Sequence, residues 1–152
     1  MRRASSPIPF QCASLWLTVL LMAMPSLAAP EPCSLVTTAE VEQVVGKLKG
    51  VPKADNEGAA SWCNYEFANG KDLMEVWVFP AEAIERGRKV SKKPVVIKGL
   101  GDEAFMDRGM HGIKYVNLFI RKGGTTVKLS IQETHDDEEK LKALAKKALN
   151  RF

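Results

Sequence analysis

The most constraining feature of this 152-residue chain is the segment 112–132, in which apolar and polar residues alternate on both sides of Gly123-Gly124. A glycine pair between two alternating segments is typical of a tight β-hairpin turn. Folding the chain there brings together three apolar pairs, Ile120 with Val127, Leu118 with Leu129, and Val116 with Ile131. A slip of one residue would turn all six side chains toward water, so the alternation predicts the register as well as the hairpin.

A second hairpin is predicted over residues 61–79, with its turn at Asn69-Gly70. One face then carries the pairs Cys63 with Val76, Tyr65 with Met74, and Ser61 with Val78. The opposite face brings Trp62 against Trp77, on what is otherwise the polar side of the strands.

Three helices are predicted around these hairpins. Residues 37–45 begin with Thr37 and have Glu40 three positions later, which is a capping box. Helices are also expected over 81–89 and 136–151, short strands over 95–97 and 102–106, and loops over 47–59 and 107–112. This order predicts an α+β fold with an antiparallel sheet built from two hairpins plus a short strand, and with helices packed mainly on one face.

The first 28 residues are predicted to be a secretory signal peptide. Arg2 and Arg3 are followed by the uncharged apolar run 13–24, and Ser26 and Ala28 are the small residues that a signal peptidase recognises. The run is short for a membrane-spanning helix. We therefore expect residues 29–152 to be a single exported domain in the periplasm or outside the cell, with no stable transmembrane segment.

Cleavage would also remove Cys12 and leave Cys33 and Cys63 as an even pair in an oxidising compartment, which predicts a disulfide. Two cysteines are too few for a metal site. Without Arg2 and Arg3 the chain has 20 basic and 18 acidic residues, a formal charge of +2, so its charge does not indicate nucleic-acid binding.

No set of residues with the spacing of a catalytic site is present. The histidines, His111 and His135, share no fixed spacing, and oxidised cysteines would not act as nucleophiles. We therefore predict a chain that is not an enzyme and has neither cofactor nor metal, with a hydrolase as a less favoured alternative.

Two surfaces are candidates for binding. The aromatic one comprises Trp62, Trp77, Phe79, Tyr115 and Phe119, whose flat rings suit sugar rings or an extended peptide. Alternatively, the helix 81–89 or the loop 47–59 covers this face, or the tryptophan pair only stabilises the sheet. The basic one comprises Arg86, Arg88, Lys89, Lys92 and Lys93, for anionic polymers or lipid headgroups, unless it is an ordinary solvated face.

Short motifs also resemble a group of small exported bacterial domains of unknown function, often lipoproteins. These motifs are CSLVT at 33–37, the helix end at Val45-Gly46, CNY at 63–65 and GLGDEA at 99–104. The resemblance implies an α+β domain in which the two cysteines pair, and no established enzymatic activity. This chain has no lipidation cysteine at the cleavage point, so its attachment to the envelope stays open.

These observations together predict a non-enzymatic, exported accessory module of the cell envelope that binds a ligand or protein, for example an envelope polymer. The alternative is an inhibitor or chaperone of another exported protein, which would use the exposed loop 107–112.

Overall fold

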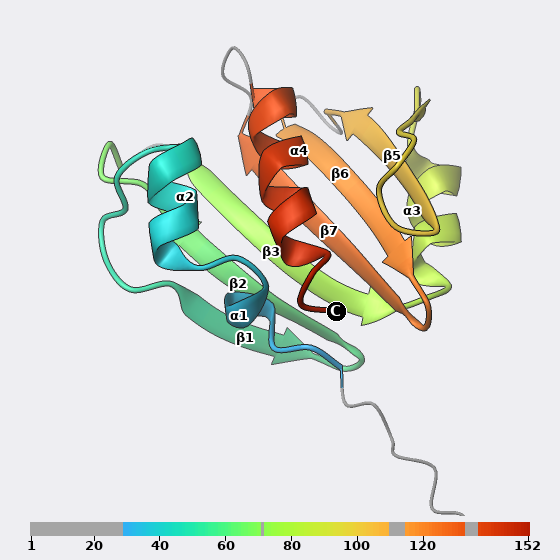
Figure 1. Cartoon of the computed structure of the whole chain (residues 1–152), viewed down its shortest axis with the longest axis horizontal. Helices are drawn as coiled ribbons and strands as arrows, with labels where there is room; N and C mark the ends of the chain where they lie inside the picture. The colour runs from blue at the N-terminus through green and yellow to red at the C-terminus, as the bar shows by residue number, and fades with distance from the viewer. Residues whose placement is uncertain (1–28, 71, 110–114, 133–136) are drawn as a thin grey trace, which may run out of the picture.

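The computed structural model describes residues 29–70, 72–109, 115–132 and 137–152, so the predicted signal peptide lies outside the described residues. One seven-stranded antiparallel sheet holds the fold together, with the strand order β1-β2-β3-β7-β6-β5-β4 (Figure 1). The strands are β1 (Lys53–Glu57), β2 (Ala60–Glu66), β3 (Leu73–Pro80), β4 (Val95–Val96), β5 (Glu103–Arg108), β6 (Tyr115–Lys122) and β7 (Thr125–Gln132). The mixed α+β class predicted from the sequence is confirmed.

Both predicted hairpins form with the predicted registers. In the β6–β7 hairpin, Leu118 is opposite Leu129, and in the β2–β3 hairpin, Cys63 is opposite Val76. Gly123 and Gly70 have φ angles of 56° and 66° in the two turns, a left-handed conformation that glycine adopts without a steric penalty. Alternation along each strand was therefore sufficient to fix which residues are paired.

The two hairpins join through β3 and β7, which run antiparallel and place Val76 opposite Leu129 and Trp77 opposite Lys128. One three-stranded unit, β1-β2-β3, thus becomes continuous with the four-stranded unit β7-β6-β5-β4. The apolar faces of both hairpins come to lie on the same side of the sheet, which we call the inner face.

Four helices are described: α1 (Pro32–Leu35), α2 (Thr38–Val44), α3 (Ala83–Val90) and α4 (Asp137–Ala148). Figure 1 looks onto the inner face, with α4 in front of β6 and β7, and α1 and α2 beside it. Leu141 and Leu144 of α4 are fully buried in the same cluster as Leu118 and Leu129. The helix α3 instead packs on the opposite face, which we call the outer face, where its Gly87 meets the ring of Phe119.

The start of α2 shows the predicted capping box. The backbone N–H of Thr37 donates to Glu40 Oε2 at 2.9 Å, and the N–H of Glu40 donates to Thr37 Oγ1 at 3.3 Å. Glu40 also accepts two hydrogen bonds of 2.8 Å from the Arg151 guanidinium. These bonds lower the pKa of Glu40 to about 2, with Arg151 as the main cause, and tie the chain's end to α2.

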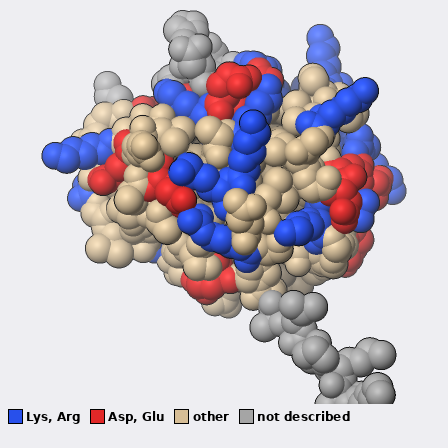
Figure 2. Space-filling view, in the orientation of Figure 1, with Lys and Arg blue, Asp and Glu red and all other residues tan. Residues whose placement is uncertain are grey.

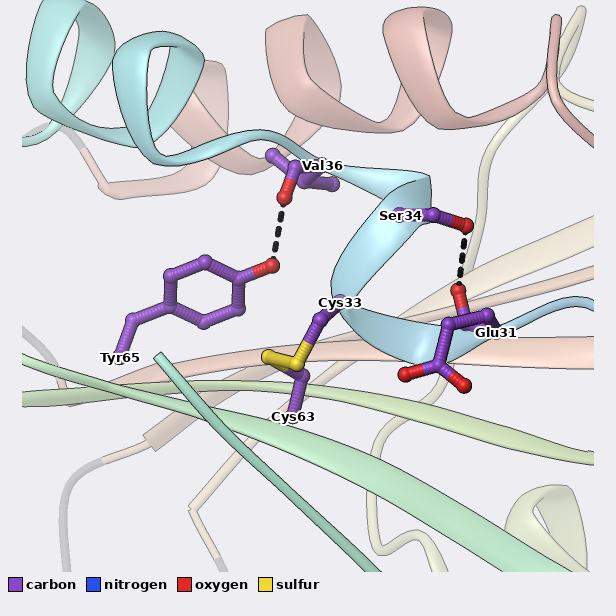
Figure 3. The surroundings of a disulfide bond; sticks show 6 residues. All are labelled: Glu31, Cys33, Ser34, Val36, Cys63 and Tyr65. Carbon is purple, nitrogen blue, oxygen red and sulfur yellow. Dashed lines mark hydrogen bonds between the residues drawn. A yellow bond between two sulfur atoms is a disulfide. The ribbon is translucent and has the colours of Figure 1, made fainter. Parts of the chain in front are cut away.

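The predicted disulfide joins Cys33 of α1 to Cys63 of β2 (Figure 3). Close to it, the hydroxyl of the fully buried Tyr65 donates to the carbonyl of Val36 at 2.5 Å. Burial of the ring raises the pKa of Tyr65. A covalent bond and a buried hydrogen bond thus hold the N-terminal segment against the inner face of the sheet.

Two sequence predictions need correction, and one short helix was missed. The predicted loop 47–59 is wrong for Lys53–Glu57, which form β1; all five residues are exposed, so this edge strand has no apolar alternation to reveal it. The short helix α1 was not predicted. The predicted loop 107–112 is wrong for Asp107 and Arg108, which extend β5, while 110–112 lie outside the described residues.

Within the described residues, no helix is both long enough and apolar enough to cross a bilayer. The longest, α4, has 12 residues, which is well below the roughly 20 that a membrane-spanning helix needs.

Candidate functional site

The outer face of the sheet is organised as parallel rows of side chains, because residues that are paired across neighbouring strands lie side by side on one face. One row is mainly aromatic and crosses five strands in the order Trp62, Trp77, Lys128, Phe119 and Phe105. The next row is polar and crosses the same five strands in the order Asn64, Glu75, Ser130, Asn117 and Asp107. Together they form a strip in which apolar and hydrogen-bonding groups lie next to each other.

Trp77 is enclosed by its neighbours in the aromatic row. Its ring stacks on Trp62 with 4.5 Å between the centroids, and the Lys128 ammonium on the neighbouring strand lies 4.5 Å from its centroid. The ring of Phe79 lies parallel to that of Trp77, with 5.6 Å between the centroids. The indole N–H of Trp77 donates to Glu75 Oε2 at 3.1 Å. Both ring faces of Trp77 are therefore occupied within the fold.

Trp62 differs from Trp77 because, among the described residues, the indole of Trp77 is the one ring that stacks on it, on one of its two faces. Trp77 covers that face, and the residue opposite Trp62 on the other side is Asp55 of the exposed strand β1. Both indoles are half-buried. The two tryptophans that the sequence treats alike therefore differ in the groups that pack against their rings.

Phe119 and Tyr115 do not belong to the tryptophan cluster. Phe119 stacks on Phe105 at 4.7 Å, and Gly87 of α3 lies directly against its ring. A Cβ atom at position 87 would lie 2.9 Å from that ring, so only glycine allows α3 to pack this closely. Tyr115 lies at the far end of β6, where it lines a hollow beside α3.

This hollow, which we call the Asp107 hollow, has a volume of about 260 Å³. It lies between α3 and the polar row. Its lining comprises Glu75, Gly87, Val90, Ser91, Asp107, Tyr115, Asn117, Phe119, Lys128 and Ser130. One edge of the hollow therefore adjoins the aromatic row at Lys128.

Charged groups of both signs line the Asp107 hollow. Burial lowers the pKa of the Lys128 ammonium, and the nearby Glu75 carboxylate acts in the opposite direction. The Ser130 hydroxyl donates to Asn117 Oδ1 at 2.8 Å. Asp107 is only 4 % exposed, and no hydrogen bond or ion pair to its carboxylate is found within the described residues. No fully enclosed side-chain oxygen or nitrogen there lacks a partner, so the Asp107 carboxylate opens onto the hollow.

Sequence reasoning identified the aromatic residues but missed the polar row. The alternation along β6 and β7 already placed Asn117 and Ser130 on the outer face. Asp107 was assigned to a loop, and extending the predicted strand 102–106 by one pleat would have placed it in the same row. The alternation of side chains along the strands therefore contained the information that places these polar residues on one face, although no sequence motif marks them.

The predicted basic patch is only partly free for binding. Arg88 forms an ion pair with Glu103 and lies 5.0 Å from the centroid of the Phe105 ring, so it fastens α3 to the sheet. The rest of the patch is exposed and has no ion pair within the described part of the chain: Arg86, Lys89, Lys92 and Lys93. A patch of this kind matches a solvated helix face as well as an anion-binding surface.

Positive side chains also gather over α4, in the middle of the inner side shown in Figure 2. Most of them are paired with acids. Lys140 contacts Asp137, Lys142 contacts Glu138 and Glu139, and Lys147 and Arg151 both contact Glu40. This pairing reduces the net field that a distant anion would meet, so charge does not single out the inner side as a binding surface.

Within residues 29–70, 72–109, 115–132 and 137–152, no group of three or more acidic, histidine or cysteine side chains has the geometry of a metal site. His111 and His135 lie outside the described residues. The two cysteines that could have acted as nucleophiles are joined in the disulfide.

Comparison with protein-family models, with curated proteins and with solved structures finds no match to this chain.

Proposed function

We propose that this chain is a non-enzymatic, exported accessory module of the cell envelope that binds a carbohydrate chain on the outer face of its sheet. Export is supported by the leader-like segment 1–28 and by the disulfide, because disulfides persist in oxidising compartments. The similarity of its short motifs to small exported domains supports the same compartment.

The observation that carries this proposal is the pairing of an aromatic row with a polar row on the outer face. A sugar ring has an apolar C–H surface and a rim of hydroxyl groups. The first packs against a flat aromatic ring, and the second exchanges hydrogen bonds with carboxylates, amides and hydroxyls. Because Asn64 and Glu75 lie beside Trp62 and Trp77, both kinds of contact are available to one chain of sugars.

Trp62 supplies the stacking surface in this proposal, and Trp77 supports it from behind. A ligand on the free face of Trp62 would extend the stack Trp62–Trp77–Lys128 by one layer. Farther along, the strip leads to the Asp107 hollow, where α3 forms a wall. A polymer lying across the strands would therefore meet an aromatic surface first and a polar recess second.

The test is a calorimetric titration of the exported chain with cellotetraose and with the chitin tetramer, which are neutral probes. Replacing Trp62 by alanine should weaken binding about tenfold or more, because stacking on an aromatic ring is lost. A matched control is Val95→Ala, which shortens an exposed apolar residue on β4, at the opposite edge of the sheet. The proposal is wrong if neither probe binds, or if Trp62→Ala and Val95→Ala bind equally well.

A further inference from the structure

Asp107 is a largely buried carboxylate for which no hydrogen bond or ion pair is found within the described residues. It lies on β5 opposite Asn117, with its side chain on the outer face, and only 4 % of the residue is exposed. Burial of a carboxylate is costly unless hydrogen bonds or an opposite charge compensate it. No protein group of this kind is found next to Asp107 within the described residues, and because no fully enclosed side-chain oxygen lacks a partner, its carboxylate faces the hollow.

The other charges around the hollow do not supply that partner. Lys128 lies over the ring of Trp77, and the carboxylate that acts on its ammonium is Glu75. Arg88 is committed to Glu103. The hollow therefore contains two carboxylates, those of Asp107 and Glu75, and a single ammonium that is already held at its edge.

The rest of the lining suits a small cation. Tyr115 contributes an aromatic ring to the lining, and an aromatic ring attracts an ammonium group through its π-electrons. Asn117 and Ser130 add hydrogen-bonding groups to the same lining. The volume of about 260 Å³ is below the roughly 300–1,000 Å³ of drug-sized sites, so the hollow fits one charged substituent and its sugar ring.

From this arrangement we infer that the Asp107 hollow is a subsite for a primary ammonium group, and that the preferred ligand is a glycan with free amino groups. This inference rests on the proposed function, since the aromatic row would hold the sugar chain whose amino group enters the hollow. Asp107 would then form a charge-assisted hydrogen bond with the ammonium, which is stronger than a bond between neutral groups.

Three tetrasaccharides with the same linkage test this inference: the chitosan tetramer, the chitin tetramer and cellotetraose. They differ at the 2-position, which carries an ammonium, an acetamide or a hydroxyl group. The exported chain should bind the chitosan tetramer about 10- to 100-fold more tightly than the other two, since hydrogen bonds to charged groups are worth this much.

Asp107→Asn keeps the size of the side chain and removes its charge. It should abolish the preference for the chitosan tetramer while leaving the binding of the two neutral tetramers unchanged. The matched control is Glu85→Gln, which removes one negative charge from the exposed side of α3 and should keep the preference.

A thermal-unfolding measurement adds a second readout. Without ligand, Asp107→Asn should raise Tm, because it removes a buried charge that has no partner. A fall in Tm would show that the fold already compensates the carboxylate, which overturns the inference. Equal binding of the three tetramers, or a preference that survives Asp107→Asn, overturns the inference but leaves the proposed function standing. If no tetramer binds, the proposed function fails and this inference fails with it.

Discussion

The two faces of β7 are buried by different means. On the inner face, Leu129 is fully buried against α4, which follows it in the chain, and against β3 and β6 beside it. On the outer face, Lys128 is covered mainly by side chains of its own sheet, with Trp77 on one side and Phe119 on the other. Of these two adjacent residues, Leu129 thus belongs to the apolar core, while Lys128 is held by pairwise contacts with individual side chains.

Because of this difference, we expect the inner face to provide most of the stability and the outer face to provide the binding surface. The inner face buries aliphatic side chains in a cluster that reaches from Leu35 to Ala148, so it is the main source of folding free energy. The outer face gains less from apolar burial, and its strip of aromatic and polar groups stays partly accessible. Variants on the two faces should therefore change different properties, and the four below are given from the largest expected effect to the smallest.

Leu129→Ala should lower the free energy of unfolding by roughly 3–4 kcal/mol, because it removes a fully buried side chain and leaves a cavity. Lys128→Ala, one residue away on the outer face, should cost about 1 kcal/mol, the size of a cation–π contact. Urea unfolding with the disulfide intact measures both. Equal costs for the two variants would contradict the distinction between the faces.

Replacing Cys33 and Cys63 together by serine should lower the free energy of unfolding by about 3 kcal/mol, since the bond closes a loop between residues 30 positions apart. The control is chemical reduction. A reducing agent should lower the Tm of the parent chain and leave that of the double variant unchanged. If reduction has no effect on the parent, the bond does not contribute to holding α1 on the inner face.

Trp77→Ala should cost about 2–3 kcal/mol, and Trp62→Ala about 1 kcal/mol, because Trp62, Phe79 and Lys128 all pack on the Trp77 ring, while the described ring contact of Trp62 is with Trp77. Denaturant unfolding of the two single variants gives the comparison directly. Binding to the neutral tetramers should show the opposite order. Under conditions where both variants are folded, Trp62→Ala should lose more affinity than Trp77→Ala. A larger stability loss for Trp62→Ala would assign the tryptophans the opposite roles.

Glu40 adds a charge-based contact on the inner side of the molecule. Its pKa is lowered from 4.5 to about 2, so its stabilising contribution is fully present above pH 4.5 and is lost as the pH falls toward 2. At pH 6, Glu40→Gln should be less stable than the parent by roughly 1 kcal/mol. Unfolding curves from pH 6 to pH 2 should show this difference shrinking. A difference that stays constant over this range would mean that it does not come from the charge of Glu40.

Much of the fold could be predicted from the sequence because several of its signals are local. The turns Asn69-Gly70 and Gly123-Gly124, the alternation beside them and the capping box of Thr37 and Glu40 need only neighbouring residues. The edge strand β1 was missed for the same reason. An exposed edge strand requires no apolar alternation. The strand conformation of β1 depends instead on its hydrogen-bonded pairing with β2.

Less of the candidate site could be predicted. The sequence placed Trp62 opposite Trp77 but left open whether the pair binds a ligand or only stabilises the sheet. The register of one strand pair does not show which groups pack on the outer sides of the two rings. The sequence also gave no reason to connect Asp107 with Glu75, because they are 32 positions apart and meet only through β6 and β7. The row that connects them exists only once β3 pairs with β7.

By itself, the sequence determined the α+β class and the registers of the two hairpins, since alternation and turn glycines act over short distances. It also predicted the pairing of Cys33 with Cys63, because these are the two cysteines outside the leader-like segment. Tertiary structure decided that β3 joins β7, that α3 covers only part of the outer face, and that Trp77 has Lys128 and Phe79 against its ring as well as Trp62. These features depend on contacts between segments distant in the chain, where side-chain volumes such as those of Gly87 and Phe119 select one packing among several with the same local pattern.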